Sequence, residues 1–235
     1  MNRMKLILTC EHGGNQIPPE HQSLFEGHEA LLNSHRGFDL GALNAARRLA
    51  DRFSAPLFYS TTSRLLVDLN RSRSHPHLFS EITKPLPTEV KEAILLNYYN
   101  PYRGDVEKAI GEAFGENKAA LHISVHSFTP IWEGLERKAD IGILYDPSRA
   151  KEKQFARRWQ RKLREIHGDW VVRRNDPYRG KADGFVTHLR RRFSPHEYVG
   201  IELEINQKSL VETPEKRQDL VPAIASSLQD ILLNA

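Results

Sequence analysis

Short apolar runs alternate with amphipathic segments along this chain, and no other sequence feature constrains its fold as strongly. Seven runs predict strands, at residues 5–9, 56–59, 65–68, 121–125, 140–145, 170–173 and 199–205. Five segments with apolar residues at helical spacing predict helices, at residues 39–53, 88–99, 101–114, 147–166 and 213–233. Strands that alternate with helices are typical of a three-layer αβα sandwich around a mixed, largely parallel sheet. Because no repeat or linker interrupts this order, we expect one domain over residues 1–235.

The composition limits the class of protein. Hydrophobic residues make up 39% and charged residues 27%, which is typical of a globular chain. No apolar run reaches the roughly 18 residues that a membrane span needs, and the apolar stretch near the start is too short for a signal peptide. Cys10 is the single cysteine, which excludes an intrachain disulfide and fits a reducing compartment. We therefore expect a soluble cytoplasmic protein without a membrane partner.

Positive charge is concentrated in one segment. Residues 151–192 carry fourteen Lys and Arg against five Asp and Glu, a pattern that can attract nucleic acid or an anionic ligand. However, Phe155, Trp159 and Leu163 recur at helical spacing with the charges on the other side, which is typical of a helix that covers a core. Aromatic residues are not interleaved with the charges as base stacking requires. We do not expect a nucleic-acid partner.

Several polar residues lie at the predicted strand ends, where ligands bind in open α/β sheets. The first predicted strand leads to His12, and the fourth leads to His126. The last predicted strand carries Glu202 and Glu204, which share one face because they are two residues apart. A carboxylate inside an apolar strand needs a partner or a function. Imidazole suits zinc and a base must activate its water, so these residues together predict a zinc hydrolase site.

The third predicted strand also delivers polar groups at its end. Asp68, Asn70 and Arg71 follow it, and Arg64 precedes it. A guanidinium group binds a carboxylate through two parallel hydrogen bonds, which an ammonium group cannot do. The segment therefore predicts a carboxylate-binding arginine, with a structural Arg–Asp pair as the alternative.

Seven short motifs, in the same order along the chain, resemble the N-formylglutamate amidohydrolase family. They are CEHGGNQIP at 10–18, HRGFDLGA at 35–42, SR at 63–64 with DLNR at 68–71, YNPY at 99–102, SVHSFTP at 124–130, DIGILY at 140–145 and ELEINQ at 202–207. The family is similar to the zinc carboxypeptidases and to the aspartoacylase and succinylglutamate desuccinylase group. The resemblance implies a phosphorylase/hydrolase-like, zinc exopeptidase-like αβα sandwich that binds one zinc ion per chain. It also implies hydrolysis of the amide bond of an N-formyl or N-acyl amino acid such as N-formylglutamate, which releases formate and the amino acid.

The metal ligands do not follow the carboxypeptidase pattern. Those enzymes take two ligands from His-x-x-Glu, whereas the residue three positions after His12 is Asn15. Asp39, in the family's Gly-Phe-Asp-like segment, is our choice for the ligand beside His12 and His126, with the fourth position open for water. A simple helix N-cap is the alternative role for Asp39. Glu11 and Cys10 remain alternative ligands, although Glu11 should face away from His12 if the strand continues.

The other site residues receive roles from the same resemblance. Glu204 would take a proton from the attacking water and pass it to the leaving amine, with Glu202 as the alternative base. Arg71, helped by Asn70 and Arg64, would hold the carboxylate of a small-molecule substrate. His188 would line the pocket or serve a structural role. Arg103 stands where relatives often have histidine, which leaves the details of the substrate open.

Two other functions are compatible with the sequence. Within enzymes, the alternative is a zinc carboxypeptidase-like peptidase or a deacylase of another N-acyl amino acid. From another class, the alternative is a non-catalytic domain that binds an anionic ligand or nucleic acid through residues 151–192.

Overall fold

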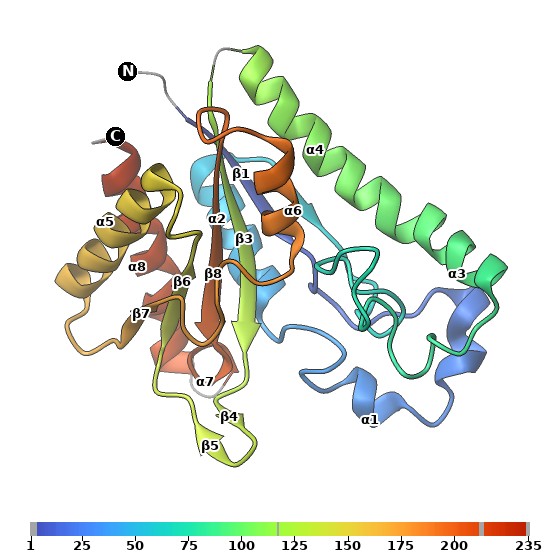
Figure 1. The fold of residues 1–235 in the computed structure, drawn as a ribbon. Coiled ribbons are helices and arrows are strands. Elements are labelled where there is room, and N and C mark those ends of the chain that lie inside the picture. Colours follow the sequence, from blue (N-terminus) through green and yellow to red (C-terminus); the bar gives the residue numbers. More distant parts are fainter. Residues whose placement is uncertain (1–3, 117, 212–213, 234–235) are drawn as a thin grey trace.

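The computed structural model describes residues 4–116, 118–211 and 214–233, and it has the expected αβα architecture (Figure 1). A six-stranded sheet has the order β2-β1-β3-β8-β6-β7. Its strands are β1 Lys5–Cys10, β2 Leu57–Tyr59, β3 Ala120–Phe128, β6 Ile141–Leu144, β7 Val172–Arg174 and β8 Tyr198–Asn206. Neighbouring strands are parallel except for β6 and β8, so the predicted mixed, largely parallel sheet is confirmed. A hairpin of β4 (Ile131–Trp132) and β5 (Leu135–Glu136) extends beyond the carboxyl end of β3 (Figure 1).

Helices cover both faces of the sheet. They are α1 Glu29–Leu32, α2 Ala42–Phe53, α3 Thr88–Ile94, α4 Asn100–Gly115, α5 Ala150–Ile166, α6 Phe185–Arg192, α7 Gln207–Val211 and α8 Pro214–Leu233, with a 3-10 helix at Pro19–Phe25 and a π-helical turn at Leu95–Tyr99. Figure 1 shows α5 beside α8 on one side of the sheet, and α4 on the other. None of the described helices is long and apolar enough to cross a membrane.

The two faces of β3 differ in character because successive side chains of a strand point in opposite directions. Leu121, Ile123 and Val125 join the large apolar core that α2, α5 and α8 complete. Between them, Ser124 and His126 point to the other face, where they are buried but polar. The first face provides hydrophobic stabilisation, which leaves the second face free to carry chemistry.

The strand predicted at residues 65–68 is wrong. This segment forms a turn in the connection between β2 and α3, with the Leu66 N–H bonded to the Ser63 carbonyl. Its apolar side chains are buried in a separate cluster, so they gave the sequence signal of a strand. The hydroxyl groups of Ser80 and Thr83 satisfy the Leu65 carbonyl, and Thr83 also bonds the Leu66 carbonyl. Buried backbone groups here find side-chain partners in place of a sheet ladder.

Two helices begin or continue differently from the prediction. The helix expected at 39–53 begins at Ala42, after Gly41 in the left-handed region with φ of 78°, so Asp39 is not its cap residue. The break expected at Pro101 is a π-helical turn that joins α3 to α4, since proline removes one backbone donor from the ladder. The predicted start of the last helix at Thr213 lies outside the described residues, and α8 is described from Pro214. Helix α6 has no counterpart among the predicted helices.

A buried ion cluster connects α5, α6 and β8. Glu152 is fully buried, and its carboxylate lies 3.1 Å from Arg190 Nε through both oxygens and 3.2 Å from Arg149 Nε. It also accepts hydrogen bonds from the backbone N–H groups of Asp146 and Gly200. Removal of this carboxylate would leave two buried guanidinium groups without their counter-charge.

We expect Glu152→Ala to lower the free energy of unfolding by about 3–5 kcal/mol, the range for breaking a buried ion pair from one side. Urea unfolding followed by circular dichroism measures the change. The control is Glu165→Ala in the same helix, where the carboxylate is exposed and pairs with Arg161 and Lys162. That variant should leave stability essentially unchanged, and equal losses in both variants would contradict the assigned role of Glu152.

Candidate active site

Two histidines and an aspartate converge at the carboxyl ends of the neighbouring parallel strands β1 and β3. One ligand atom from each of His12, Asp39 and His126 lies within 4.8 Å of the others, and all three residues are buried. His12 lies just after β1, and His126 lies near the end of β3. The N–H of Asp39 donates to the carbonyl of His12 at 2.9 Å, which brings the segment before α2 to the strand end. The structure thus brings together the three residues that the sequence analysis chose as metal ligands.

The Nδ1 atoms of both histidines face the carboxylate of Asp39. His126 Nδ1 lies 2.8 Å from Asp39 Oδ2, and His12 Nδ1 lies 3.5 Å from the same oxygen. Among the described residues, His12 Nδ1 is a buried nitrogen without a hydrogen-bond partner. Buried polar atoms rarely lack a partner, so a free nitrogen aimed at a carboxylate is a suitable position for a cation.

The Nε2 atoms of both histidines lie close to carboxylates. His12 Nε2 lies 2.7 Å from Asp68 Oδ1, and His126 Nε2 lies 3.2 Å from Glu11 Oε2 and 2.8 Å from Ser124 Oγ. Histidines that bind metals commonly donate their second ring nitrogen to a carboxylate, which fixes the tautomer and orients the ring. Both rings in this cluster have that arrangement.

Electrostatic coupling shifts the pKa values of these groups. Burial opposes the protonation of His126, but its bonds to Asp39 and Glu11 outweigh burial and raise its pKa well above the ordinary range. Burial alone would raise the carboxyl pKa values of Glu11 and Asp39, yet the neighbouring histidines hold both well below their usual range. The carboxylates of the cluster therefore remain ionised at neutral pH.

Arg64 joins the two aspartates of the cluster. Its Nη1 donates to Asp39 Oδ1 at 3.1 Å, and its Nη2 donates to Asp68 Oδ2 at 3.0 Å. Burial alone would raise the pKa of Asp68, but the charges of Arg64 and His12 lower it well below its usual range. The guanidinium of Arg64 thus orients carboxylates of the protein.

Glu204 lies next to His126 on the adjoining strand. The two residues are directly paired in the register of β3 and β8, and Glu204 is 5% exposed. Its Oε2 is buried without a hydrogen-bond partner among the described residues, and burial raises its pKa to about 8. Glu202 shares this face one pair earlier, opposite Ser124, and burial also raises its pKa.

Arg71 lies near the same carboxylate oxygen of Asp68 that Arg64 binds. Its Nε is 3.8 Å from Asp68 Oδ2, and its Nη1 donates to the Asp183 carbonyl at 3.0 Å. A third of its side chain is exposed. Asn70, the next residue, uses its side-chain oxygen to accept the Phe185 N–H at 2.7 Å, at the beginning of α6.

His188 and Arg103 have other partners. His188 Nε2 lies 2.8 Å from Glu107 Oε1, a contact between α6 and α4, and its side chain is 40% exposed. Arg103 is buried over the rings of Phe185 and Tyr99, and it donates to backbone carbonyls that include the carbonyl of Leu69. Neither side chain belongs to the metal cluster as the structure describes it.

The two alternative ligands take different places. Cys10 points into the apolar core with Leu6 and Leu8, and burial raises the thiol pKa well above its ordinary value. Glu11 lies behind His126, where it also accepts hydrogen bonds from Ser124 Oγ at 2.6 Å and Tyr102 Oη at 3.1 Å. Neither belongs to the metal cluster found among the described residues.

Ser124 and Tyr102 are site residues that the sequence analysis did not assign. Both hold Glu11, which in turn holds His126. Ser124 had a usable signal, because it lies two residues before His126 and therefore on the same face of β3. Tyr102 had none beyond its place in a family motif, since only the tertiary fold brings α4 to β1.

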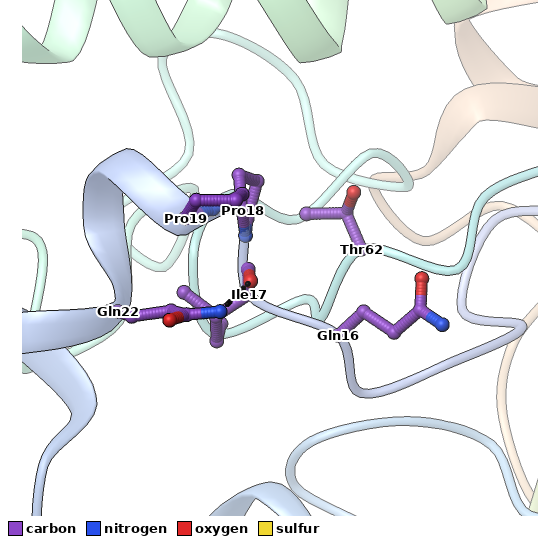
Figure 2. Close-up of a pocket in the computed structure, with 6 residues that line it drawn as sticks. All are labelled: Gln16, Ile17, Pro18, Pro19, Gln22 and Thr62. Carbon is purple, nitrogen blue, oxygen red and sulfur yellow. Dashed lines mark hydrogen bonds between the residues drawn. The ribbon is translucent and has the colours of Figure 1, made fainter.

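A separate pocket of about 430 Å³ lies in the segment after β1 (Figure 2). Its lining residues are Gln16, Ile17, Pro18, Pro19, Gln22 and Thr62. None of these side chains ionises in the physiological range, and none belongs to the histidine–aspartate cluster. This pocket therefore offers no group for metal or acid–base chemistry.

Comparisons with known proteins agree with this architecture. The structure of the gene product Atu2144 from Agrobacterium tumefaciens is similar, with 28% sequence identity, a TM-score of 0.78, and coverage of 98% of this chain and 92% of that one. An N-formylglutamate amidohydrolase from Ralstonia eutropha JMP134 shares the fold at 18% identity and a TM-score of 0.74, over 100% of this chain and 94% of that one. A search of curated proteins found no match.

A model of one protein family matches most of the chain, over residues 4–211. The matched region contains the buried histidines, Asp39, Asp68 and Glu204. The family is described as N-formylglutamate amidohydrolase, the family that the sequence motifs resemble. This chain belongs to the N-formylglutamate amidohydrolase family.

Proposed function

We propose that this protein hydrolyses the amide bond of an N-formyl amino acid such as N-formylglutamate, with one zinc ion held by His12, Asp39 and His126. The observation that carries the proposal is the buried Nδ1 of His12, which faces Asp39 without a hydrogen-bond partner among the described residues. Membership of the family supports amidohydrolase chemistry. The local geometry supports the metal.

The donor set fits zinc. Two imidazole nitrogens and one carboxylate oxygen are common ligands of catalytic zinc sites, which keep the fourth position open. A zinc ion bound there would act as a Lewis acid that polarises the amide carbonyl and acidifies the attacking water. Asp68 and Glu11 fix the two rings from behind, which should hold both Nδ1 atoms toward the ion.

Glu204 has the environment of a general base that becomes a general acid. Its carboxylate is buried next to His126, and the absence of a hydrogen-bond partner at Oε2, within the described residues, leaves that atom able to accept a proton. Because burial raises its pKa to about 8, the group can hold that proton and donate it to the leaving amine near neutral pH. Glu202 is less suited because it lies one strand pair farther from His126.

Arg71 is the residue that we assign to a substrate carboxylate. Its guanidinium lies near the carboxylate of Asp68, which in turn bonds His12. The side chain of Arg71 is partly exposed. Its Nη1 contact to the Asp183 carbonyl holds the guanidinium in place while other N–H groups stay available for a bidentate contact.

The first prediction concerns zinc content. Chelator-free protein should contain about one zinc per chain by elemental analysis, and His12→Ala and His126→Ala should each lose most of it. His188→Ala is the matched control, because it removes a histidine that also contacts a carboxylate but lies outside the cluster. Circular dichroism should show that all variants are folded. Stoichiometric zinc in both cluster variants would refute the ligand assignment.

The second prediction concerns the base. Glu204→Gln should keep its zinc but lose at least about 100-fold in turnover, the usual scale for general acid–base catalysis. Glu202→Gln, on the same strand face, is the matched control and should retain most activity. Steady-state kinetics on N-formylglutamate measures both variants. If Glu202→Gln lost turnover while Glu204→Gln retained it, Glu202 would be the base.

The third prediction concerns Arg71. Loss of a charge-assisted contact should cost roughly 2–4 kcal/mol of transition-state binding, so Arg71→Ala should lose about 30- to 1000-fold in kcat/KM. Arg71→Lys should recover only part, because an ammonium group cannot bind in a bidentate manner. The assay compares N-formylglutamate with its two mono-amides, and Arg71→Ala should lose the preference for one free carboxylate.

Arg73→Ala is the control for Arg71, since Arg73 is an exposed neighbour that pairs with Glu92. It should leave kcat/KM close to the wild-type value. If Arg71→Ala instead slows the diacid and both mono-amides equally, Arg71 acts on structure or on the reacting carbonyl, and the substrate carboxylate is bound elsewhere.

A further inference from the structure

The guanidinium group of Arg137 lies among three aromatic rings. Its guanidinium carbon lies 5.7 Å from the ring centre of Phe128, 5.0 Å from Trp132 and 5.1 Å from Tyr178. Its Nη1 donates to the Tyr178 hydroxyl at 3.1 Å and to the Thr129 carbonyl at 3.5 Å. Within the described part of the chain, Arg137 forms no ion pair, whereas the guanidinium groups of Arg64 and Arg190 are paired with carboxylates.

The strands that carry the cluster also position Arg137. Phe128, under the guanidinium, lies two residues after His126 on the same face of β3. Asn206 lies two residues after Glu204 on β8, and its side-chain amide donates to the Arg137 carbonyl at 3.3 Å. Two residues of strand span about 7 Å, so Arg137 is anchored roughly one substrate length beyond His126 and Glu204.

Tyr178 approaches the same place from a loop that crosses the sheet beside Glu204. Gly142 is paired with Glu204, and a Cβ at Gly142 would overlap the carbonyl oxygen of Asp176. The missing side chain therefore lets the loop pass over β6. Asn175 Oδ1 accepts the N–H groups of Tyr145 at 3.0 Å and of Gly180 at 3.2 Å, which fixes the loop on both sides of Tyr178.

The electrostatic neighbours of Tyr178 support this placement. Burial raises the pKa of its phenol, and the charges of Glu204 and Asp39 raise it further. Tyr178 therefore stays protonated at neutral pH, so its hydroxyl can accept a hydrogen bond from Arg137 and donate one to an anion.

Resting on the proposed function, we propose that Arg137 and Tyr178 are the residues that bind the second carboxylate of an N-formyl diacid substrate. Arg71 lies near Asp68, which bonds His12. Arg137 lies over Phe128, which is two residues from His126 on β3. In this proposal each of the two guanidinium groups binds one carboxylate of the diacid. A guanidinium that stacks on rings keeps its in-plane N–H groups for a carboxylate.

The experiment measures kcat/KM on N-formylglutamate, N-formylglutamine and N-formylisoglutamine, which keep both carboxylates, the α-carboxylate and the side-chain carboxylate respectively. Arg137→Gln should lose at least about 10-fold on the diacid and on one mono-amide, and little on the other. Arg71→Ala should show the complementary pattern. Tyr178→Phe should weaken the same preference as Arg137→Gln, by a smaller factor, and Arg137→Lys should recover part of it.

Arg161→Gln, on the exposed face of α5, is the control and should match wild type on all three substrates. The Arg137 variants should fold, because the backbone of this residue bonds Pro130 and Asn206 through atoms that remain. Thermal melting checks this. Equal losses on all three substrates, or loss of the same preference in the Arg137 and Arg71 variants, would overturn the inference.

A binding measurement separates this inference from the proposed reaction. Calorimetry should show that wild type binds glutarate more tightly than butyrate, and that Arg137→Gln binds the two alike. If no N-formyl substrate is cleaved but this difference is seen, the proposed reaction is wrong and the Arg137 site stands. If wild type cleaves N-formyl substrates but binds glutarate no better than butyrate, the Arg137 site is wrong and the reaction stands.

Discussion

The electrostatics of one buried cluster set the requirements for the rest of this structure. Glu11, Asp39 and Asp68 are buried within contact distance of two histidines, and the hydrogen bonds of the cluster favour their ionised forms. Arg64 supplies one full positive charge to Asp39 and Asp68. Buried charges are costly unless they are paired, and this cluster contains more carboxylates than permanent cations. A divalent cation near His12 Nδ1 would offset that excess, which is a physical reason for the proposed zinc that does not depend on the family.

The sheet offsets the energetic cost of burying this cluster. The opposite face of β3 and β8 packs its apolar side chains under α2, α5 and α8, so hydrophobic burial on that face stabilises both strands. Ser124, His126 and Glu204 are therefore held by strands that this core keeps in place. Such support is what a catalytic site needs, because a shift of one ångström in a reacting group is costly to the rate.

Much of this arrangement could be predicted from the sequence, for identifiable reasons. The strand-end rule selected His12 and His126 because the runs before them are clear, and the two-residue spacing placed Glu202 and Glu204 on one face. Asp39 came from the family motif, since a helix N-cap explained the same residue equally well before the left-handed Gly41 was known. Glu11 lies on the face opposite Cys10, as alternation expects, because it bonds Ser124 and Tyr102 while Cys10 lies in the apolar core. Since β1 ends at Cys10, alternation no longer determines the direction of His12.

The remaining features depend on tertiary contacts that have no local signal. The segment at 65–68 has the composition of a strand, but it forms a turn in which the hydroxyl groups of Ser80 and Thr83 bond its backbone carbonyls.

Four arginines near the sheet likewise look alike in the sequence and differ only in what surrounds them. Arg64 and Arg190 are paired with carboxylates, and Arg103 lies over rings and donates to carbonyls. Arg137 also lies over rings, but these are Phe128, Trp132 and Tyr178, and it is only half-buried. A cation that forms no ion pair among the described residues attracts an anion more strongly than a paired one, which is why we assign Arg137, and not Arg64, Arg103 or Arg190, to an anionic ligand.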